Sequence, residues 1–170
     1  LNLKTGAILS HDPAMLITRQ CNATFDPNAA CPMWLKFIND IFKGNTALIE
    51  YVQRAIGYSI TGLVDEEVMF FMFGYGANGK SVFINTIFSV LNDYAVTTPS
   101  SMLSVKGSDS KGRATPELTK IVGARFAVAN ETQSGERLDE QMVKILVSRE
   151  RISARQLYSD YFDFKPTHAL

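Results

Sequence analysis

The spacing of apolar residues predicts two amphipathic helices in the first third of the chain. Over residues 32–43 the apolar side chains recur on one stripe, with Pro32 suited to a first helical turn and Gly44 placed to end the helix. A second helix is predicted over residues 46–57, with Thr46 as its N-cap. We expect the two apolar faces to pack together in a small helical N-terminal segment, residues 1–62.

The pattern changes after these helices. Residues 68–73 form a continuous apolar run that ends at a glycine-rich turn, which is typical of a strand buried on both faces of a parallel sheet. Residues 81–91 return to helical spacing. A second buried strand is predicted at 125–129 and a further helix at 138–147. This alternation predicts an α/β fold over residues 63–170, with a parallel sheet flanked by helices.

Composition limits the class of protein. The chain has 170 residues, of which 17 are basic, 17 are acidic and 46% are apolar. This composition is typical of one globular domain. Two cysteines are too few for a disulfide framework, so we expect two ordinary thiols. The longest uncharged runs are shorter than the roughly 18 apolar residues that a membrane helix needs. We therefore expect no membrane partner and no signal peptide, and hence a cytoplasmic protein, with both ends cut from a longer chain.

Residues 74–81, Gly-Tyr-Gly-Ala-Asn-Gly-Lys-Ser, fit the phosphate-loop pattern G-x-x-x-x-G-K-[ST] at every specified position. Glycines allow a tight turn that aims backbone N–H groups at a β-phosphate, and the following helix adds its N-terminal amides. Lys80 is predicted to bridge the β- and γ-phosphates, and Ser81 to offer a hydroxyl to Mg²⁺. The alternative is a glycine-rich turn that contains Lys-Ser by chance. The predicted nucleotide-binding residues are Gly74, Gly76, Ala77, Asn78, Gly79, Lys80, Ser81 and Val82.

A phosphate-loop enzyme also needs a carboxylate at the end of a neighbouring strand. Glu131 follows the predicted strand at 125–129, about fifty residues beyond Lys80. It is predicted either to take a proton from the attacking water or to lie near the metal, and the sequence leaves both roles open. In the alternative interpretation, Asn130 and Glu131 only turn the chain into the next helix.

The middle of the chain is its basic part. Residues 68–130 carry six basic and three acidic side chains, and much of this excess lies in the Gly- and Ser-rich stretch 104–116. Lys106, Lys111 and Arg113 in this stretch are interpreted either as a phosphate-contacting loop or as a solvated surface loop.

The sequence resembles the helicase part of phage and plasmid primase proteins, within the superfamily 3 helicases and the poxvirus-type primase-helicases. The resemblance rests on the phosphate loop and on segments spread over most of the chain, namely 3–6, 25–27, 31–34, 57–62, 123–125, 131–132, 138–139, Lys144, 152–155 and 164–166. It implies an AAA+-related P-loop ATPase that assembles as a homo-hexamer. Such a ring hydrolyses ATP with Mg²⁺ between subunits and translocates on single-stranded DNA, including the single strand of forked DNA.

The resemblance also suggests DNA-contacting residues near the end of the chain. Residues 148–150, Ser-Arg-Glu, replace a Gly-Gly-Asp-like turn of the family, where we expect a DNA-contacting hairpin. Arg149 and Arg151 would either add phosphate contacts there or be ordinary surface residues. Lys144 and Arg155 match the family pattern and are assigned to DNA or to a neighbouring subunit. The candidate DNA contacts are thus Lys106, Lys111, Arg113, Lys144, Arg149, Arg151 and Arg155.

The family's polar sensor and arginine finger are expected beyond Leu170, so we expect these 170 residues alone to bind nucleotide poorly or hydrolyse it slowly. Two other functions remain alternatives. One is a nucleotide-dependent DNA-binding scaffold without efficient hydrolysis. The other is a small-molecule P-loop kinase, which would need its own acceptor-binding lid.

Overall fold

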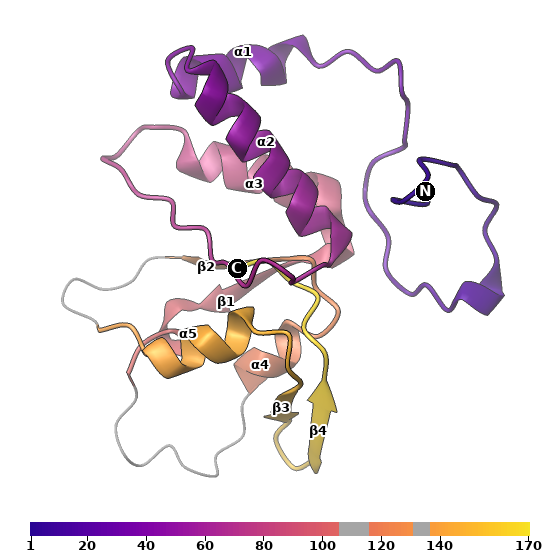
Figure 1. Cartoon of the computed structure of the whole chain (residues 1–170), viewed down its shortest axis with the longest axis vertical. Helices are drawn as coiled ribbons and strands as arrows, with labels where there is room; N and C mark the ends of the chain where they lie inside the picture. Colours follow the sequence, from indigo (N-terminus) through magenta and orange to yellow (C-terminus); the bar gives the residue numbers. More distant parts are fainter. Residues whose placement is uncertain (106–115, 131–136) are drawn as a thin grey trace. The chain divides into compact units, whose positions relative to one another are not determined.

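The computed structural model describes residues 1–105, 116–130 and 137–170 of the chain. Helices and short strands are mixed along these stretches, which confirms the α/β character predicted from the sequence (Figure 1). Within them, no helix is both long enough and apolar enough to cross a lipid bilayer.

The described residues form two compact units. The first contains residues 1–61 and 72–93, and the second contains residues 62–71 and 94–170. The division expected at residue 62 falls at the end of the N-terminal helices. The first unit also contains the glycine-rich loop and the helix after it, which the division by sequence assigns to the ATPase core.

Three helices form the regular part of the first unit: α1 (Pro32–Ile41), α2 (Thr46–Thr61) and α3 (Lys80–Leu91). The helices predicted at 32–43 and 81–91 are confirmed, because α1 begins with its proline in the first turn and α3 begins directly after the glycine-rich loop. Helix α3 buries one side chain every fourth residue, namely Phe83, Ile87 and Leu91.

Helix α2 differs from its prediction at both ends. Its first turn is capped by Asn45 rather than Thr46, because Oδ1 of Asn45 accepts a hydrogen bond from the Leu48 backbone N–H at 3.1 Å. The predicted end at Gly57 is also wrong, since the helix continues past this residue. A glycine inside a helix costs only about 1 kcal/mol relative to alanine, so it need not stop one. The left-handed residue that follows the helix is Gly62.

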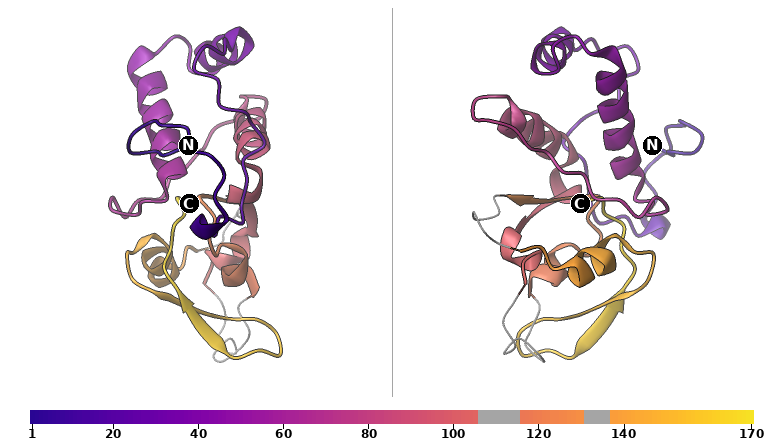
Figure 2. Two further views of the ribbon diagram at one scale, coloured as in Figure 1. Left: turned by 90° about the vertical axis from the view of Figure 1, so that its right-hand side faces the viewer. Right: turned by 60° about the vertical axis from the view of Figure 1, so that its left-hand side comes forward.

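The residues before α1 form an irregular trace in both views of Figure 2. A short 3₁₀ turn at Pro13–Met15 is capped by the Asp12 carboxylate, which accepts a hydrogen bond from the Ala14 N–H at 2.9 Å. Further along, the Asn22 N–H donates to the Val90 carbonyl at 2.9 Å. The N-terminal segment is therefore attached to the C-terminal end of α3.

The second unit contains a parallel pair of strands, β1 (Ala95–Pro99) and β2 (Phe126–Asn130). The strand predicted at 125–129 is confirmed in β2. On the other edge of β2, Phe126 forms a parallel bridge with Ala169, whose carbonyl accepts the Ala127 N–H at 3.0 Å. The described part of the predicted parallel sheet thus consists of two strands and this single bridge.

The strand predicted at 68–73 is wrong. No regular strand forms there, and Phe71 and Phe73 are 63% and 86% exposed. The Phe70 N–H donates to the Leu170 carbonyl at 2.8 Å, but a strand requires a continuous ladder with a partner of matching length. The segment that pairs with it, residues 168–170, is too short to form such a ladder. Apolarity alone therefore did not determine the conformation of this segment.

The remaining elements of the second unit are α4 (Pro116–Lys120), α5 (Glu140–Val147) and an antiparallel hairpin of β3 (Ile152–Arg155) and β4 (Tyr161–Phe164). Helices α4 and α5 lie on the same face of the β1–β2 pair (Figures 1 and 2). The helix predicted at 138–147 is confirmed in α5, whose N-cap Asp139 accepts the Met142 N–H at 3.0 Å. The core of this unit consists of Met102, Leu103, Leu118, Ile121, Ala127, Leu146, Ile152, Ala154, Phe164 and Leu170.

Candidate functional site

The glycine-rich loop at residues 74–81 turns the chain sharply into α3. Ala77 and Gly79 adopt left-handed backbone angles, with φ of +58° and +85°, and Gly79 is the N-cap of the helix. The Gly79 carbonyl accepts the first helical hydrogen bond, from the Phe83 N–H at 2.9 Å. Because the first amides of a helix have no partner within it, the loop leads into a cluster of backbone N–H donors.

The side chain of Lys80 folds back over this loop. Its Nζ atom donates to the Gly74 carbonyl at 2.8 Å and to Oδ1 of Asn78 at 3.0 Å, and it lies 3.5 Å from the Tyr75 carbonyl. All three acceptors are uncharged. The ammonium group is thus held at the mouth of the loop by oxygens that carry no charge, and an anionic oxygen that replaced one of them would add attraction between opposite charges.

Two glycines of the loop are in contact with neighbouring atoms. A Cβ atom at Gly74 would lie 2.3 Å from Nδ2 of Asn78, and one at Gly79 would lie 2.7 Å from Cγ2 of Ile41. Both distances are shorter than real Cβ contacts allow. A side chain at Gly74 would therefore displace the Asn78 side chain, and one at Gly79 would displace Ile41 of α1.

The residues that are present suit a phosphate group and its magnesium ion. The Lys80 ammonium and the first amides of α3 are donors to phosphate oxygens, and the exposed Ser81 in the first turn of α3 carries a hydroxyl that can coordinate Mg²⁺. The predicted contacts Gly76, Ala77, Asn78 and Val82 lie in the same loop or in this first turn. In residues 1–105, 116–130 and 137–170, no group of three His, Cys, Asp or Glu side chains is placed to hold a metal ion.

The predicted acidic partner Glu131 lies outside the described residues. Strand β2 leads directly to it, since β2 ends at Asn130. The roles of Glu131 as a base or as a metal-organising group therefore stay predictions.

The seven predicted DNA contacts are only partly described. Lys106, Lys111 and Arg113 lie outside the described residues. The other four belong to the second unit but to different elements of it, since Lys144 is on α5, Arg149 and Arg151 are in the α5–β3 link, and Arg155 is on β3.

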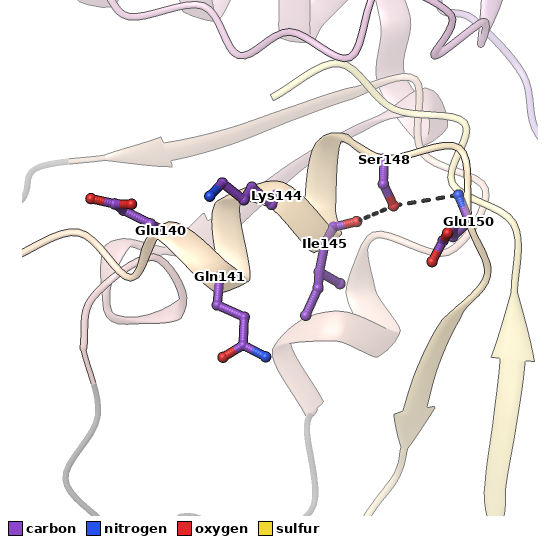
Figure 3. Close-up of a pocket in the computed structure, with 6 residues that line it drawn as sticks. All are labelled: Glu140, Gln141, Lys144, Ile145, Ser148 and Glu150. Carbon is purple, nitrogen blue, oxygen red and sulfur yellow. Dashed lines mark hydrogen bonds between the residues drawn. The ribbon is translucent and has the colours of Figure 1, made fainter.

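Two of these cations have neighbours of opposite charge. Nε of Arg149 lies 3.3 Å from Oε1 of Glu67, and its Nη2 donates to the Asp65 carbonyl at 2.6 Å. Lys144 lines a shallow pocket of about 490 Å³ on α5 (Figure 3). The pocket lining carries two carboxylates and one ammonium group, so it is not a net-positive surface; it comprises Glu140, Gln141, Lys144, Ile145, Ser148 and Glu150.

The hairpin lies later in the chain than the sequence suggested. Residues 148–150 link α5 to β3, whereas the hairpin consists of β3 and β4, with its turn at 156–160. The turn, Gln-Leu-Tyr-Ser-Asp, joins a strand of alternating burial to one that is mostly exposed, and it contains no glycine or proline that would mark it in the sequence.

The turn and the outer face of this hairpin expose apolar and aromatic side chains. Leu157 and Tyr158 at the turn are 64% and 96% exposed, and Tyr161 on β4 is 56% exposed. The guanidinium carbon of Arg155 lies 5.2 Å from the centre of the Tyr161 ring. An exposed tyrosine beside an arginine–tyrosine pair is thus a feature that the sequence analysis did not single out.

One buried histidine belongs to the same unit. His168 is 2% exposed, and its burial lowers its pKa to about 4, against a smaller opposing effect of the Leu146 backbone. The imidazole is therefore neutral at physiological pH, and it contributes no positive charge to the surface of this unit.

Comparison with known proteins identifies relatives of the chain. A family model described as "D5 N terminal like" matches residues 1–43. A protein named "Putative helicase L207/L206" from Acanthamoeba polyphaga mimivirus is 30% identical over 117 residues, which is 69% of this chain and 12% of the relative. A second, named "Putative helicase 022R" from Frog virus 3 (isolate Goorha), is 28% identical over 140 residues, or 80% of this chain and 14% of the relative.

The chain spans about an eighth of the length of each of these two viral proteins. The family model covers the irregular N-terminal segment and α1, and the alignments with the two relatives cover 69% and 80% of the chain. The chain belongs to the primase-helicase family of the poxvirus and phage type.

Proposed function

We propose that this chain is the nucleotide-binding part of an ATP-dependent DNA helicase module in a viral, phage or plasmid replication protein. The observation that carries the proposal is the Lys80 ammonium group, held at the mouth of a glycine-rich turn by three uncharged oxygens. A lysine in this position, directly before the first amides of a helix, has the chemistry of a triphosphate site. The two viral relatives, which are named as helicases, favour DNA unwinding as the work that the nucleotide drives.

The first step is binding of the ATP phosphates at residues 74–81. Phosphate oxygens replace the carbonyl and amide oxygens around Nζ of Lys80, because an anionic acceptor adds attraction between opposite charges that a neutral oxygen lacks. The first amides of α3 bind the same anion. Lys80 then lies where it can neutralise the charge that develops on the terminal phosphate during hydrolysis.

Ser81 and Glu131 are the residues that we propose for the metal and the attacking water. Ser81 would hold Mg²⁺ through its hydroxyl, and Glu131 would orient the water or the metal from the end of β2. Magnesium supplies neutralising charge to the phosphate oxygens when it is bound.

DNA contact is proposed for the β3–β4 hairpin. Tyr158 offers an almost fully exposed ring at the turn, and bases of any sequence can stack on such a ring. Arg151, directly before β3, and Arg155, at its end, add positive charge that attracts the phosphates of a single strand. Lys106, Lys111, Lys144, Arg113 and Arg149 remain further candidates for this contact.

The proposed working form is a homo-hexameric AAA+-related ring in which ATP is hydrolysed between subunits. A ring provides a central channel for single-stranded DNA, and it would allow neighbouring subunits to supply a sensor and an arginine finger. We propose this assembly for the natural full-length protein in the host cytoplasm.

The rate of ATP hydrolysis with and without single-stranded DNA tests the proposal. The natural full-length protein should hydrolyse ATP faster when single-stranded DNA is added, and Lys80→Ala should abolish both rates. ATP binding without hydrolysis under either condition would contradict the motor and would indicate the DNA-binding scaffold instead. Phosphate transfer to a small-molecule acceptor without any effect of DNA would indicate the kinase.

A further inference from the structure

Helix α1 packs directly against the glycine at which α3 begins. A Cβ atom on Gly79 would lie 2.7 Å from Cγ2 of Ile41 and 3.2 and 3.3 Å from two ring carbons of Phe37. Gly79 is also the N-cap of α3 and precedes Lys80. The side chains of α1 therefore touch the one residue that sets the start of the helix and the direction of its first amides.

An aromatic stack continues this contact into the first turn of α3. The rings of Trp34 and Phe83 are 5.7 Å apart between centroids and are inclined by 22°, and Trp34 also lies 5.6 Å from Phe37. Phe83 is 2% exposed and stands three residues after Lys80. The lysine and the buried ring are thus neighbours on one rigid helical turn.

The same N-terminal segment also holds the other end of α3. The Asn22 N–H donates to the Val90 carbonyl at 2.9 Å, and the Gln20 N–H donates to Oδ2 of Asp93 at 3.1 Å. The guanidinium group of Arg19 donates to the Asp93 carbonyl. Residues 1–43, the stretch that the family model matches, therefore contact α3 at both of its ends.

Such contacts matter because binding sites are sensitive to small displacements. Groups that bind an anion must be held within about 0.5 Å of their productive positions by the side chains that support them. Gly79 has no side chain of its own to fix it, so its position depends on the atoms that pack against its Cα, which belong to α1.

We propose that residues 1–43 act as a brace for the phosphate loop, with Ile41, Phe37 and Trp34 as positioning residues for Gly79 and Lys80. This inference rests on the proposed function, because it assumes that the loop binds a triphosphate. Nucleotide affinity then depends on α1, and binding of ATP changes the surroundings of the Trp34 ring.

Three substitutions in α1 separate positioning from general stability. Ile41→Ala removes the Cγ2 atom that touches Gly79, whereas Ile41→Val keeps a γ-carbon on the same β-carbon. Ile38→Ala is the matched control, since it removes the same atoms from a residue that is 7% exposed on the same helix, and none of the three atoms nearest to a Cβ on Gly79 belongs to Ile38. Affinity for Mg²⁺-ATP is measured by equilibrium dialysis with the natural full-length protein, at a temperature where all variants are folded.

We expect Ile41→Ala to raise the Kd for ATP about tenfold, because a small misplacement of binding groups is costly. Ile41→Val and Ile38→Ala should stay close to the wild-type value. Addition of ATP should also change tryptophan emission with the same midpoint as binding, and Trp34→Phe should remove that signal. This fluorescence measurement is made on the wild-type protein. It therefore still tests the proposal if an alanine variant does not fold.

Two results would overturn the brace while leaving the proposed function intact. In one, wild-type protein binds ATP, both alanine variants bind it equally well, and Trp34 emission does not change. In the other, Ile41→Ala and Ile38→Ala weaken binding to the same extent without a Trp34 signal, which indicates a general stability effect. Absence of ATP binding in the wild-type protein would instead overturn the proposed function, and the brace with it.

Discussion

The charge on Lys80 is satisfied by neutral oxygens, and this decides how the loop responds to an anion. In the proposed function, Nζ gives up its hydrogen bonds to the oxygens of Gly74, Tyr75 and Asn78 when it turns to a phosphate. Those bonds already involve the charged ammonium group, so the gain from the exchange is the attraction between opposite charges that a phosphate oxygen adds. We therefore propose that the exchange favours the phosphate and that Asn78 holds the lysine before the phosphate binds.

The buried His168 makes a prediction about pH. Its pKa is about 4 in the folded chain and about 6.5 when unfolded, so below pH 6.5 the unfolded state takes up a proton that the folded state does not. The contribution of His168 to folding stability should change little above this pH and fall between pH 6.5 and 4, with a loss of about 2 kcal/mol from pH 7 to pH 5. Urea unfolding at the two pH values measures this loss.

The two histidines of the chain provide a matched pair for this experiment. His168→Leu should remove the loss between pH 7 and pH 5, while His11→Leu, at an exposed position, should retain it. An unchanged loss in His168→Leu would show that other groups cause the acid sensitivity.

Whole elements were predictable from the sequence where their signals are local. The proline at the start of α1, the periodic apolar residues of α3 and the Asp139 cap of α5 act within a few residues, so the sequence shows them directly. The segment 68–73 was mispredicted because a strand depends on a distant partner. The hairpin β3–β4 was not predicted because its turn at 156–160 has no glycine or proline and β4 shows no alternation of buried and exposed residues.

In the candidate site, too, features with a local sequence signal were predictable and contacts between distant residues were not. The loop at 74–81 was predictable because its pattern is contiguous, but its contact with Ile41 was not, since a packing partner forty residues away leaves no trace in the spacing. The neighbours of Arg149, Glu67 and Asp65, were likewise hidden, because they lie about eighty residues earlier in the chain.

The hairpin gives a prediction for DNA binding. Tyr158→Ala should weaken binding of single-stranded DNA by about 1 to 3 kcal/mol, because it removes a surface on which a base stacks. Tyr51→Ala, which removes an exposed tyrosine from α2, should leave the affinity unchanged. Fluorescence anisotropy of a labelled oligonucleotide measures both, and equal affinities of the two variants would place the DNA contact elsewhere.

The 170 residues together carry no net charge, with 17 basic and 17 acidic side chains. The DNA contact proposed for them would therefore depend on local cations such as Arg151 and Arg155 rather than on their net charge. The two compact units carry different parts of the proposed activity. The phosphate loop belongs to the first unit, and the hairpin belongs to the second.

This charge balance predicts a weak dependence of DNA binding on salt. Each phosphate contact contributes about −0.7 to the slope of log K against log salt for single strands, so two or three contacts give a slope of about −2. Titrations of the oligonucleotide at several salt concentrations measure this slope. Arg151→Gln should make the slope shallower by about 0.7, which is the contribution of one phosphate contact. A slope several times steeper than about −2 would instead indicate an extended basic surface.

Strand separation on a forked DNA substrate tests the proposed motor most directly. The natural full-length protein should separate the strands when ATP and Mg²⁺ are present, and it should fail to do so with a non-hydrolysable ATP analogue. Lys80→Ala should bind the same fork without separating it, because the loop at 74–81 no longer holds the phosphates. Separation by Lys80→Ala at the wild-type rate would contradict the assignment of this loop as the site that powers the protein.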